Sequence, residues 1–351
     1  MNNFAHFAST WIVVCSSQPQ AAEHWVPQYL SAIDTRNPTN ILRIDMPSPM
    51  TGGHPPYPTG PHCLLVAIDA DAVAGWHIAL GWRMPERIID LMVEFRNSAN
   101  GHRVSCGSGL VGALLWFGLP TVGAFSCDGR PAGSCSRVEA VSRLFDVMRP
   151  TLDISRALFR GRYMIAVSRI EAIGVPIDQF QIEDLKTAWP AVRKRFVEIV
   201  DQNFGVYKVG RFQPQAFETW VENRGIAWPL TRTGHIDLSD ATFRDMARVH
   251  PELRALRELR ATLSGFDPCA IAISPAGRNC APIRPFASRT GRNQPSSKAS
   301  IFGKAAWVRN LVRPSPGMGL ALIDWTQQEF GIAAALSEDA DMLAAYGTED
   351  P

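Results

Sequence analysis

Helical periodicity in the middle of the chain is the feature that most restricts its fold. Apolar residues recur three to six positions apart over Leu152–Gly174, and the stretch closes on a glycine, the residue type that commonly ends a helix. A second apolar face runs along Ile182–Phe204, where Pro190 predicts a bend. Leucines at every third or fourth position of Leu253–Leu263 predict another helix with a polar back. The middle of the chain must therefore contain long helices.

The amino-terminal part has a different pattern. Frequent prolines between residues 18 and 60 predict a loop-rich segment without a long helix. The short apolar run Cys63–Ile68 predicts a buried strand, and the spacing over Pro85–Arg96 predicts a helix. Gly109–Phe117 is expected to form a buried helix.

The last part of the chain predicts a strand, a turn and a helix. Leu320–Ile323 is a short apolar run that ends at Asp324, and Gln327–Leu336 has helical spacing. A carboxylate at the carboxyl end of a buried strand needs a cation or a hydrogen-bond donor, because its charge is costly to bury. Two interpretations of Asp324 follow: a Mg²⁺ ligand, since Mg²⁺ prefers hard oxygen ligands, or a helix N-cap ahead of Gln327.

Length, net charge and cysteine spacing exclude several classes of protein. A length of 351 residues predicts about two domains, and the net charge of +2 excludes a strongly basic, histone-like chain. Any contact with nucleic acid must therefore depend on local patches. The seven cysteines include no Cys-x-x-Cys pair, which argues against a disulfide framework and a zinc module. Without a long apolar run, we expect a soluble, cytoplasmic protein.

One motif is a weak match to a dinucleotide-binding fingerprint. Gly107–Gly112 fits G-x-G-x-x-G, and Asp128 follows about 20 residues later. The fingerprint needs a buried strand directly before its glycines, but residues 96–103 are polar. We therefore expect these glycines to permit close packing at the start of the helix that follows them.

Asp324-Trp325-Thr326-Gln327-Gln328-Glu329 and, earlier, Thr290-Gly291-Arg292 stand in the last part of the chain. These two motifs resemble the palm of the family A DNA polymerases, the class of bacterial DNA polymerase I. The first palm motif of that family reads Asp, aromatic, Ser/Thr, Gln, any, Glu, and residues 324–329 meet every defining position with Asp324, Trp325, Thr326, Gln327 and Glu329. About thirty residues earlier, Thr290-Gly291-Arg292 matches the Thr-Gly-Arg element of the family and continues as Asn293-Gln294. Met164–Asp178 is similar to the segment that opens the polymerase domain, and Leu253–Leu263 to a thumb helix. The resemblance covers residues from about 155 to the end.

The resemblance implies nucleotidyl transfer by a two-metal mechanism, with Mg²⁺ as cofactor and with primer–template DNA and deoxynucleoside triphosphates as partners. Asp324 would be the catalytic metal ligand, the carbonyl of Trp325 a further ligand, and Glu329 the block that excludes a ribose hydroxyl. The nucleotide would be contacted by Trp325, Thr326, Gln327 and Glu329. The DNA would be contacted by Thr290, Arg292, Asn293, Gln294 and Arg309, with Lys298 and Arg313 as further candidates whose alternative is solvated surface charge.

Members of this family usually carry a proofreading exonuclease domain of ribonuclease H-like fold before the polymerase domain. Asp90 resembles the middle metal-binding Asp of that domain. The expected first strand, Trp11–Cys15, has no acid after it, and Arg137 stands where a late Asp is expected. We therefore expect a degenerate, inactive exonuclease-like domain in which Asp90 is a hydrogen-bonded relic.

The resulting expectation is an α/β (α+β) chain in four parts. Residues 1–60 form a divergent, loop-rich part, 61–150 the degenerate exonuclease-like domain, 151–285 the start of the polymerase domain with a helical thumb, and 286–351 a partial palm.

The family's second metal-binding Asp lies beyond the first palm motif in relatives. We therefore expect the 351 residues to be inactive alone, as a truncated or split polymerase of replication or repair whose carboxyl-terminal half is absent or is a separate chain. The alternatives are a non-catalytic DNA-binding remnant and a subunit that another chain completes. In either case we expect a cytoplasmic, nucleoid-associated protein.

Overall fold

A computed structural model describes residues 4, 6–18, 26–46, 53–121, 134–297, 299–303 and 306–348. It divides into two compact units, Met1–Val312 and Arg313–Pro351. Asp128 and Lys298, which the sequence analysis considered, lie outside the described residues. No helix of the described residues is long and apolar enough to cross a membrane.

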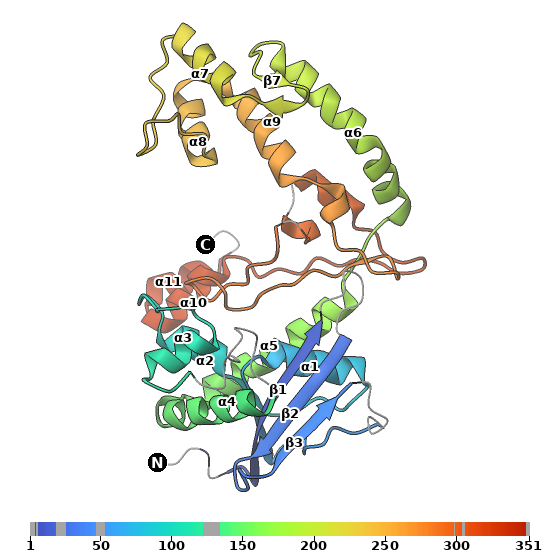
Figure 1. Cartoon of the computed structure of the whole chain (residues 1–351), viewed down its shortest axis with the longest axis vertical. Coiled ribbons are helices and arrows are strands. Elements are labelled where there is room, and N and C mark those ends of the chain that lie inside the picture. Colours follow the sequence, from blue (N-terminus) through green and yellow to red (C-terminus); the bar gives the residue numbers. More distant parts are fainter. Residues whose placement is uncertain are drawn as a thin grey trace. The chain divides into compact units, whose positions relative to one another are not determined.

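A five-stranded mixed sheet forms the amino-terminal part of the first unit (Figure 1). Its strands are β1 (Ser9–Gln18), β2 (Val26–Asp34), β3 (Ile41–Asp45), β4 (Cys63–Ala67) and β5 (Ile88–Asp90). Their order is β3-β2-β1-β4-β5. β2 runs antiparallel to both β1 and β3, while β4 is parallel to β1 and β5 is parallel to β4.

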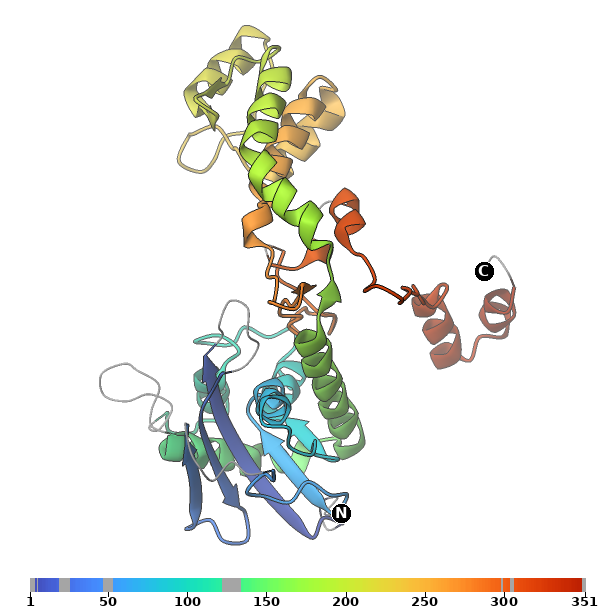
Figure 2. The same ribbon diagram turned by 90° about the vertical axis from the view of Figure 1, so that its right-hand side faces the viewer.

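Helices cover both faces of this sheet (Figures 1 and 2). They are α1 (Ala70–Ala79), α2 (Leu91–Ser98), α3 (Leu110–Trp116), α4 (Ser134–Met148) and α5 (Ile154–Ile173), with a 3₁₀ turn, η1, at Arg149–Thr151. Successive residues of a strand point to opposite faces. Ile12 and Val14 accordingly pack toward α2, α3 and α4, while Val13 packs toward α1 and α5.

Two expectations about this part are wrong. The segment 18–60 is not only loop, because β2 pairs with β1 and β3 pairs with β2, and Pro38 falls in the turn between β2 and β3. Ile88 and Ile89 form a strand rather than the start of a helix, since they pair with Leu65 and Val66 and are fully buried. A short run of β-branched apolar residues does not distinguish a strand from a helix by its spacing alone.

The glycine-rich segment before α3 has the packing role that its sequence predicts. Gly109 is the N-cap residue of α3, and a side chain at Gly112 would overlap the carbonyl group of Gly107. The predicted strand Cys63–Ile68 and the predicted helices over Gly109–Phe117, Leu152–Gly174 and Leu253–Leu263 are confirmed.

The rest of the first unit is mainly helical. It contains α6 (Gln179–Asp201), α7 (Pro214–Asn223), α8 (Asp240–Val249), α9 (Leu253–Gly265), the hairpin β7 (Tyr207–Lys208) and β8 (Arg211–Phe212), the pair β6 (Val175–Pro176) and β9 (Arg278–Asn279), and the 3₁₀ turns η2 (Pro268–Ala270), η3 (Ile301–Gly303) and η4 (Ala306–Leu311). One apolar core joins α7, α8 and α9 around Phe217 and Phe243, and another joins α6 to residues 266–312 around Trp189.

In the second unit the described residues form helices α10 (Gln328–Ser337) and α11 (Ala340–Tyr346). The hydroxyl of Tyr346 donates to the carbonyl oxygen of Thr326 at 3.2 Å, and a side chain at Gly331 would overlap the Tyr346 ring. This contact fixes the turn before α10 against α11. The predicted helix Gln327–Leu336 is therefore confirmed to within one residue at each end.

Candidate functional site

The Thr-Gly-Arg element lies in an exposed loop of the first unit. Thr290, Arg292, Asn293 and Gln294, the four DNA-contact candidates of this loop, are all exposed. The loop has no regular secondary structure, so turn hydrogen bonds and contacts with neighbouring elements must set its shape.

A tight turn displays Arg292. The backbone N–H of Gly291 donates to the carbonyl oxygen of Ser288 at 3.1 Å, and that of Arg292 donates to Ser288 Oγ at 2.7 Å. Gly291 has φ +75°, a left-handed conformation that other residues adopt only with strain. The middle residue of the Thr-Gly-Arg element is thus required by the backbone, and the residues on either side of it are presented to solvent.

Two polar contacts attach this loop to the sheet-containing part. Asn293 Nδ2 donates to the hydroxyl of Tyr163 on α5 at 2.7 Å, and Asn100 Nδ2 donates to the carbonyl oxygen of Arg289 at 2.9 Å. The ring of Phe286 packs edge-on against Tyr163, with centroids 5.4 Å apart. Arg309, the remaining DNA-contact candidate of the first unit, is exposed on η4.

The palm motif lies in the second unit and is exposed. Leu322, Ile323 and Trp325 have exposed fractions of 98%, 88% and 75%. The expected strand Leu320–Ile323 is wrong, because residues 320–325 have no regular secondary structure. A buried strand needs neighbours for its backbone hydrogen bonds, and the described residues 313–348 include no strand that could pair with it.

The N-cap interpretation of Asp324 is also wrong. The N-cap residue of α10 is Gln327, in a left-handed conformation with φ +48°, and the Asp324 carboxylate instead accepts a hydrogen bond from the backbone N–H of Trp325 at 2.9 Å. Asp324 is exposed, and Glu329 lies in the first turn of α10. Thr326 and Gln327 form the turn between these two acids.

The oxygen ligands around Asp324 are of the type that Mg²⁺ prefers, but they are few. Carboxylate and carbonyl oxygens are the ligands that Mg²⁺ prefers, and one or two carboxylates suffice when phosphates supply the rest. No group of three His, Cys, Asp or Glu side chains among the described residues is arranged to hold a metal. Asp324 and the Trp325 carbonyl could therefore hold one Mg²⁺ together with a triphosphate, but a pair of ions would need another carboxylate.

Asp90 is a buried, hydrogen-bonded residue at the end of β5. Its two carboxylate oxygens accept from the backbone N–H groups of Ala70 at 2.8 Å and Val93 at 2.9 Å, so Asp90 caps α2 and ties it to α1. Burial, and secondarily the charge of Asp69, raises the pKa of Asp90 to about 7. Asp90 is thus hydrogen-bonded as expected, while its origin as a relic of an exonuclease metal site stays a prediction.

Asp90 shares a pocket of about 510 Å³ with acids that the sequence analysis did not assign to it: Asp69, Asp71 and Glu171. Burial, followed by the charge of Glu171, raises the pKa of Asp71 to about 8, and burial also raises the pKa of Glu171. Ser168 Oγ donates to Asp71 at 2.5 Å. The signal for Asp69 and Asp71 was available, because they directly follow the buried strand β4, as Asp324 was expected to follow one.

Arginines line the same pocket. Arg96, Arg137 and Arg284 stand among its acids, and Arg137 is the residue expected in place of a metal-binding Asp. Their charges can neutralise carboxylates, which a bound cation would otherwise do.

Comparisons with known proteins place the fold. No protein-family model matches the chain, and no curated protein matches it. Among solved structures, the POL domain of Pol1 from M. smegmatis, in complex with DNA primer–template and dNTP, matches with a TM-score of 0.64 over 99% of this chain at 14% identity. The chain is similar in fold to a polymerase domain. It spans 62% of the length of that chain.

Proposed function

We propose that this chain is a family A-type DNA polymerase polypeptide that binds primer–template DNA and takes part in template-directed nucleotidyl transfer in replication or repair. The observation that carries the proposal is the likeness of its whole fold to a polymerase domain, together with the two palm motifs in the sequence. Fold alone does not fix function, so the residues of the motifs carry the chemical part of the argument.

The Thr-Gly-Arg loop supplies the DNA contact in this proposal. The planar guanidinium of Arg292 offers a fork of hydrogen-bond donors that suits phosphate. Thr290, Asn293 and Gln294 extend the polar surface around it. Such phosphate contacts fix the position of a duplex and make its binding dependent on salt.

The palm motif supplies the reaction chemistry in this proposal. When bound, Mg²⁺ would neutralise charge on the triphosphate. Asp324 and the carbonyl of Trp325 would hold the ion, while Thr326, Gln327 and Glu329 would contact the nucleotide, with Glu329 against its sugar. A further carboxylate from outside the described residues would complete a two-metal site.

A nucleotide-dependent binding assay tests this role of Asp324. Anisotropy of a labelled primer–template is measured with and without Mg²⁺ and the dNTP that pairs with the template. We expect Mg²⁺ and the matched dNTP to tighten binding, and Asp324→Asn to weaken that effect by about tenfold or more, as loss of a metal ligand does. Asp341→Asn, which changes an exposed acid of α11, is the matched control.

The same assay separates the alternatives. The exposed apolar side chains beside Asp324 favour a second candidate, a DNA-binding subunit that packs against another chain. DNA binding that ignores Mg²⁺ and dNTP would favour that candidate, and absence of DNA binding would reject both. Primer extension by the purified chain would show that the expected incompleteness is wrong.

A further inference from the structure

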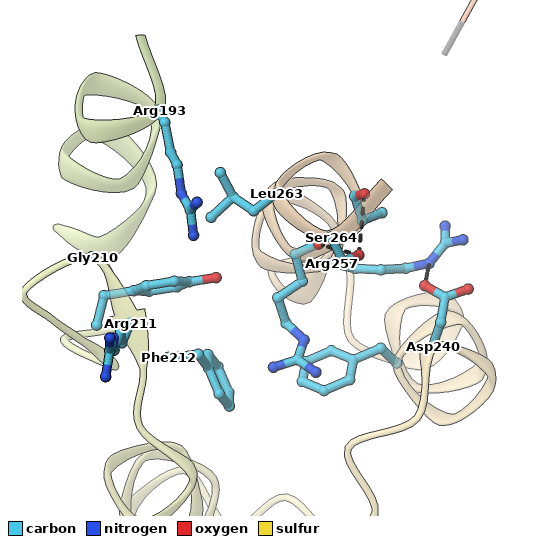
Figure 3. A pocket seen from close by; sticks show the side chains of 12 residues that line it. Arg193, Gly210, Arg211, Phe212, Asp240, Arg257, Leu263 and Ser264 are labelled. Carbon is cyan, nitrogen blue, oxygen red and sulfur yellow. Dashed lines mark hydrogen bonds and ion pairs between the residues drawn. The ribbon is translucent and has the colours of Figure 1, made fainter. Parts of the chain in front are cut away.

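A pocket of about 610 Å³ lies in the helical part of the first unit, remote in sequence from both palm motifs (Figure 3). Its walls come from α6, the β7–β8 hairpin, α8 and α9. Four arginines line it, Arg193, Arg211, Arg257 and Arg260, against a single acid, Asp240. We refer to it as the arginine pocket.

Helical spacing places two of these arginines on one wall. Arg257 and Arg260 are three residues apart on α9, so they project from the same side of the helix, at the border of the face that buries Leu256 and Leu259. Ala261 and Ser264, one turn further on, also line the pocket. Their small side chains leave this side of the pocket open.

Arg260 forms the floor of the pocket. Its guanidinium carbon lies 4.1 Å from the ring centroid of Phe212 and 4.4 Å from that of Phe243, and its Nη2 donates to the carbonyl oxygen of Leu238 at 3.0 Å. Burial lowers the pKa of Arg260. Its positive charge is thus held in place by aromatic faces and one neutral acceptor, and these do not neutralise it.

Arg257 and Arg193 have unused hydrogen-bonding capacity. Arg257 Nε is buried and has no hydrogen-bond partner among the described residues, and it forms an ion pair with Asp240 Oδ1 at 3.5 Å. Arg193 projects from α6 toward the pocket (Figure 3), and the described residues give it no hydrogen bond or ion pair. Guanidinium groups from two different helices thus converge with donors to spare.

The hairpin wall is fixed to α6. The two carboxylate oxygens of Asp201 accept from the backbone N–H groups of Val206 at 2.7 Å and Tyr207 at 3.0 Å. This holds the start of β7 at the end of α6, and the hairpin carries Arg211 to the edge of the pocket. The pocket is therefore largely preformed.

We propose that the arginine pocket binds a compact polyphosphate group, either as inorganic pyrophosphate or as the phosphate chain of a free nucleotide. Arginines that track a nucleic-acid backbone form a row along a groove, whereas these four surround a hollow. A multivalent anion of a few ångströms can contact α6 and α9 at once and occupy the unused donors of both. The pocket uses none of the palm residues, so its ligand binds independently of DNA.

Calorimetric titration of the full chain with inorganic pyrophosphate at low salt, without Mg²⁺, tests the proposal. We expect saturable binding, weakened about tenfold by each of Arg193→Gln and Arg257→Gln because each removes charge-assisted hydrogen bonds. Arg248→Gln, which changes an exposed arginine of α8 outside the pocket, should leave binding unchanged. No binding, or equal weakening by all three variants, would overturn the proposal.

A variant that is expected to tighten binding controls for misfolding. Asp240→Asn removes the one acid of the pocket, so it should tighten pyrophosphate binding several-fold, which a misfolded protein could not do. Titration with dATP distinguishes the two sources: dATP tighter than pyrophosphate identifies a nucleotide site, and the reverse a pyrophosphate site. Binding of duplex DNA that Arg193→Gln weakens, without any binding of pyrophosphate or dATP, would contradict a compact ligand.

Discussion

His77 on α1 shows how a single buried side chain sets a pH limit on stability. It is fully buried, and its Nδ1 lies 2.7 Å from the carbonyl oxygen of Arg83, which can only accept. Nδ1 must therefore carry the proton, and Nε2 accepts from the hydroxyl of Tyr57 at 2.9 Å. Burial lowers the pKa of His77 to about 4, so the ring stays neutral in the folded protein.

The contribution of His77 to stability should consequently fall as the solution becomes acidic, opposite in sign to the contributions of Asp71 and Asp90, whose raised pKa values favour the folded state as the pH falls. Below pH 6.5 the unfolded chain gains a proton on His77 that the folded chain accepts only near pH 4, so this contribution drops by about 2–3 kcal/mol between pH 7 and 4.5. The measurement is the free energy of unfolding in denaturant across this range, for wild type and His77→Gln. The difference between the two curves isolates His77 and should change by this amount. Parallel curves would show that His77 does not titrate in this way.

Val209 predicts a stabilising substitution. It is 95% exposed and has φ +50°, and Gly210 follows with φ +70°, so the β7–β8 turn holds a β-branched residue in a left-handed conformation. Val209→Asn should raise the free energy of unfolding by about 1 kcal/mol, since Asn-Gly suits this turn. Hydrogen exchange of the hairpin amides measures the effect locally. Faster exchange in the variant would mean that the Val209 side chain makes a stabilising contact.

The sequence predicted the surroundings of some residues and missed those of others. Asp90 is hydrogen-bonded as expected, to the backbone N–H groups of Ala70 and Val93, while its relic role stays a prediction. The acids Asp69 and Asp71 were not assigned to its pocket, because only the topology brings the ends of β4 and β5 together. The roles of the palm residues remain predictions, since an exposed Asp324 is compatible with more than one role.

At the scale of elements, helix α5 must approach strand β5 closely. A side chain at Gly161 of α5 would overlap the carbonyl oxygen of Ile88. The pair Arg160 and Glu94 lies beside this crossing, joined at 2.6 Å by two hydrogen bonds between α5 and α2. A buried, bidentate ion pair is costly to break, so the bond between Arg160 and Glu94 keeps α5 close to α2 next to the contact of α5 with β5.

Gly161→Ala should therefore destabilise the chain by about 1–3 kcal/mol, the usual effect of overpacking against backbone that cannot easily move. Gly265→Ala at the end of α9 is the control, because an added Cβ there meets no atom within 4 Å. It should be neutral or stabilising by up to about 1 kcal/mol. Thermal unfolding of both variants gives the comparison. Equal effects would show that the Ile88 crossing is looser than described.

Helices and strands could be predicted from the sequence where their apolar pattern extends over many residues. Helices α5 and α9 follow their apolar periodicity, whereas β5 is three residues long and was assigned to a helix. Strands β2 and β3 were missed because proline counts say nothing of the pairing of β2 with β1 and of β3 with β2, which depends on the tertiary fold. For the same reason the run Leu320–Ile323 cannot form its expected strand without a pairing partner.

At the scale of the molecule, the fold agrees with a polymerase domain, while the reaction is a proposal. Similarity at 14% identity extends over nearly the whole chain, and the chain spans 62% of its structural neighbour. The four part boundaries expected from the sequence also remain predictions. The central claim is that the Thr-Gly-Arg loop, exposed and anchored to Tyr163 through Asn293, still holds DNA.

Salt-dependent binding of the chain to a labelled primer–template, for wild type and Arg292→Ala, tests that claim most directly. We predict tight binding at low salt that weakens as salt rises, with Arg292→Ala weakening it roughly tenfold and reducing the salt slope by about one. Arg248→Ala on α8 should change neither quantity. Absence of binding at low salt, or binding that Arg292→Ala leaves unchanged, would contradict the account.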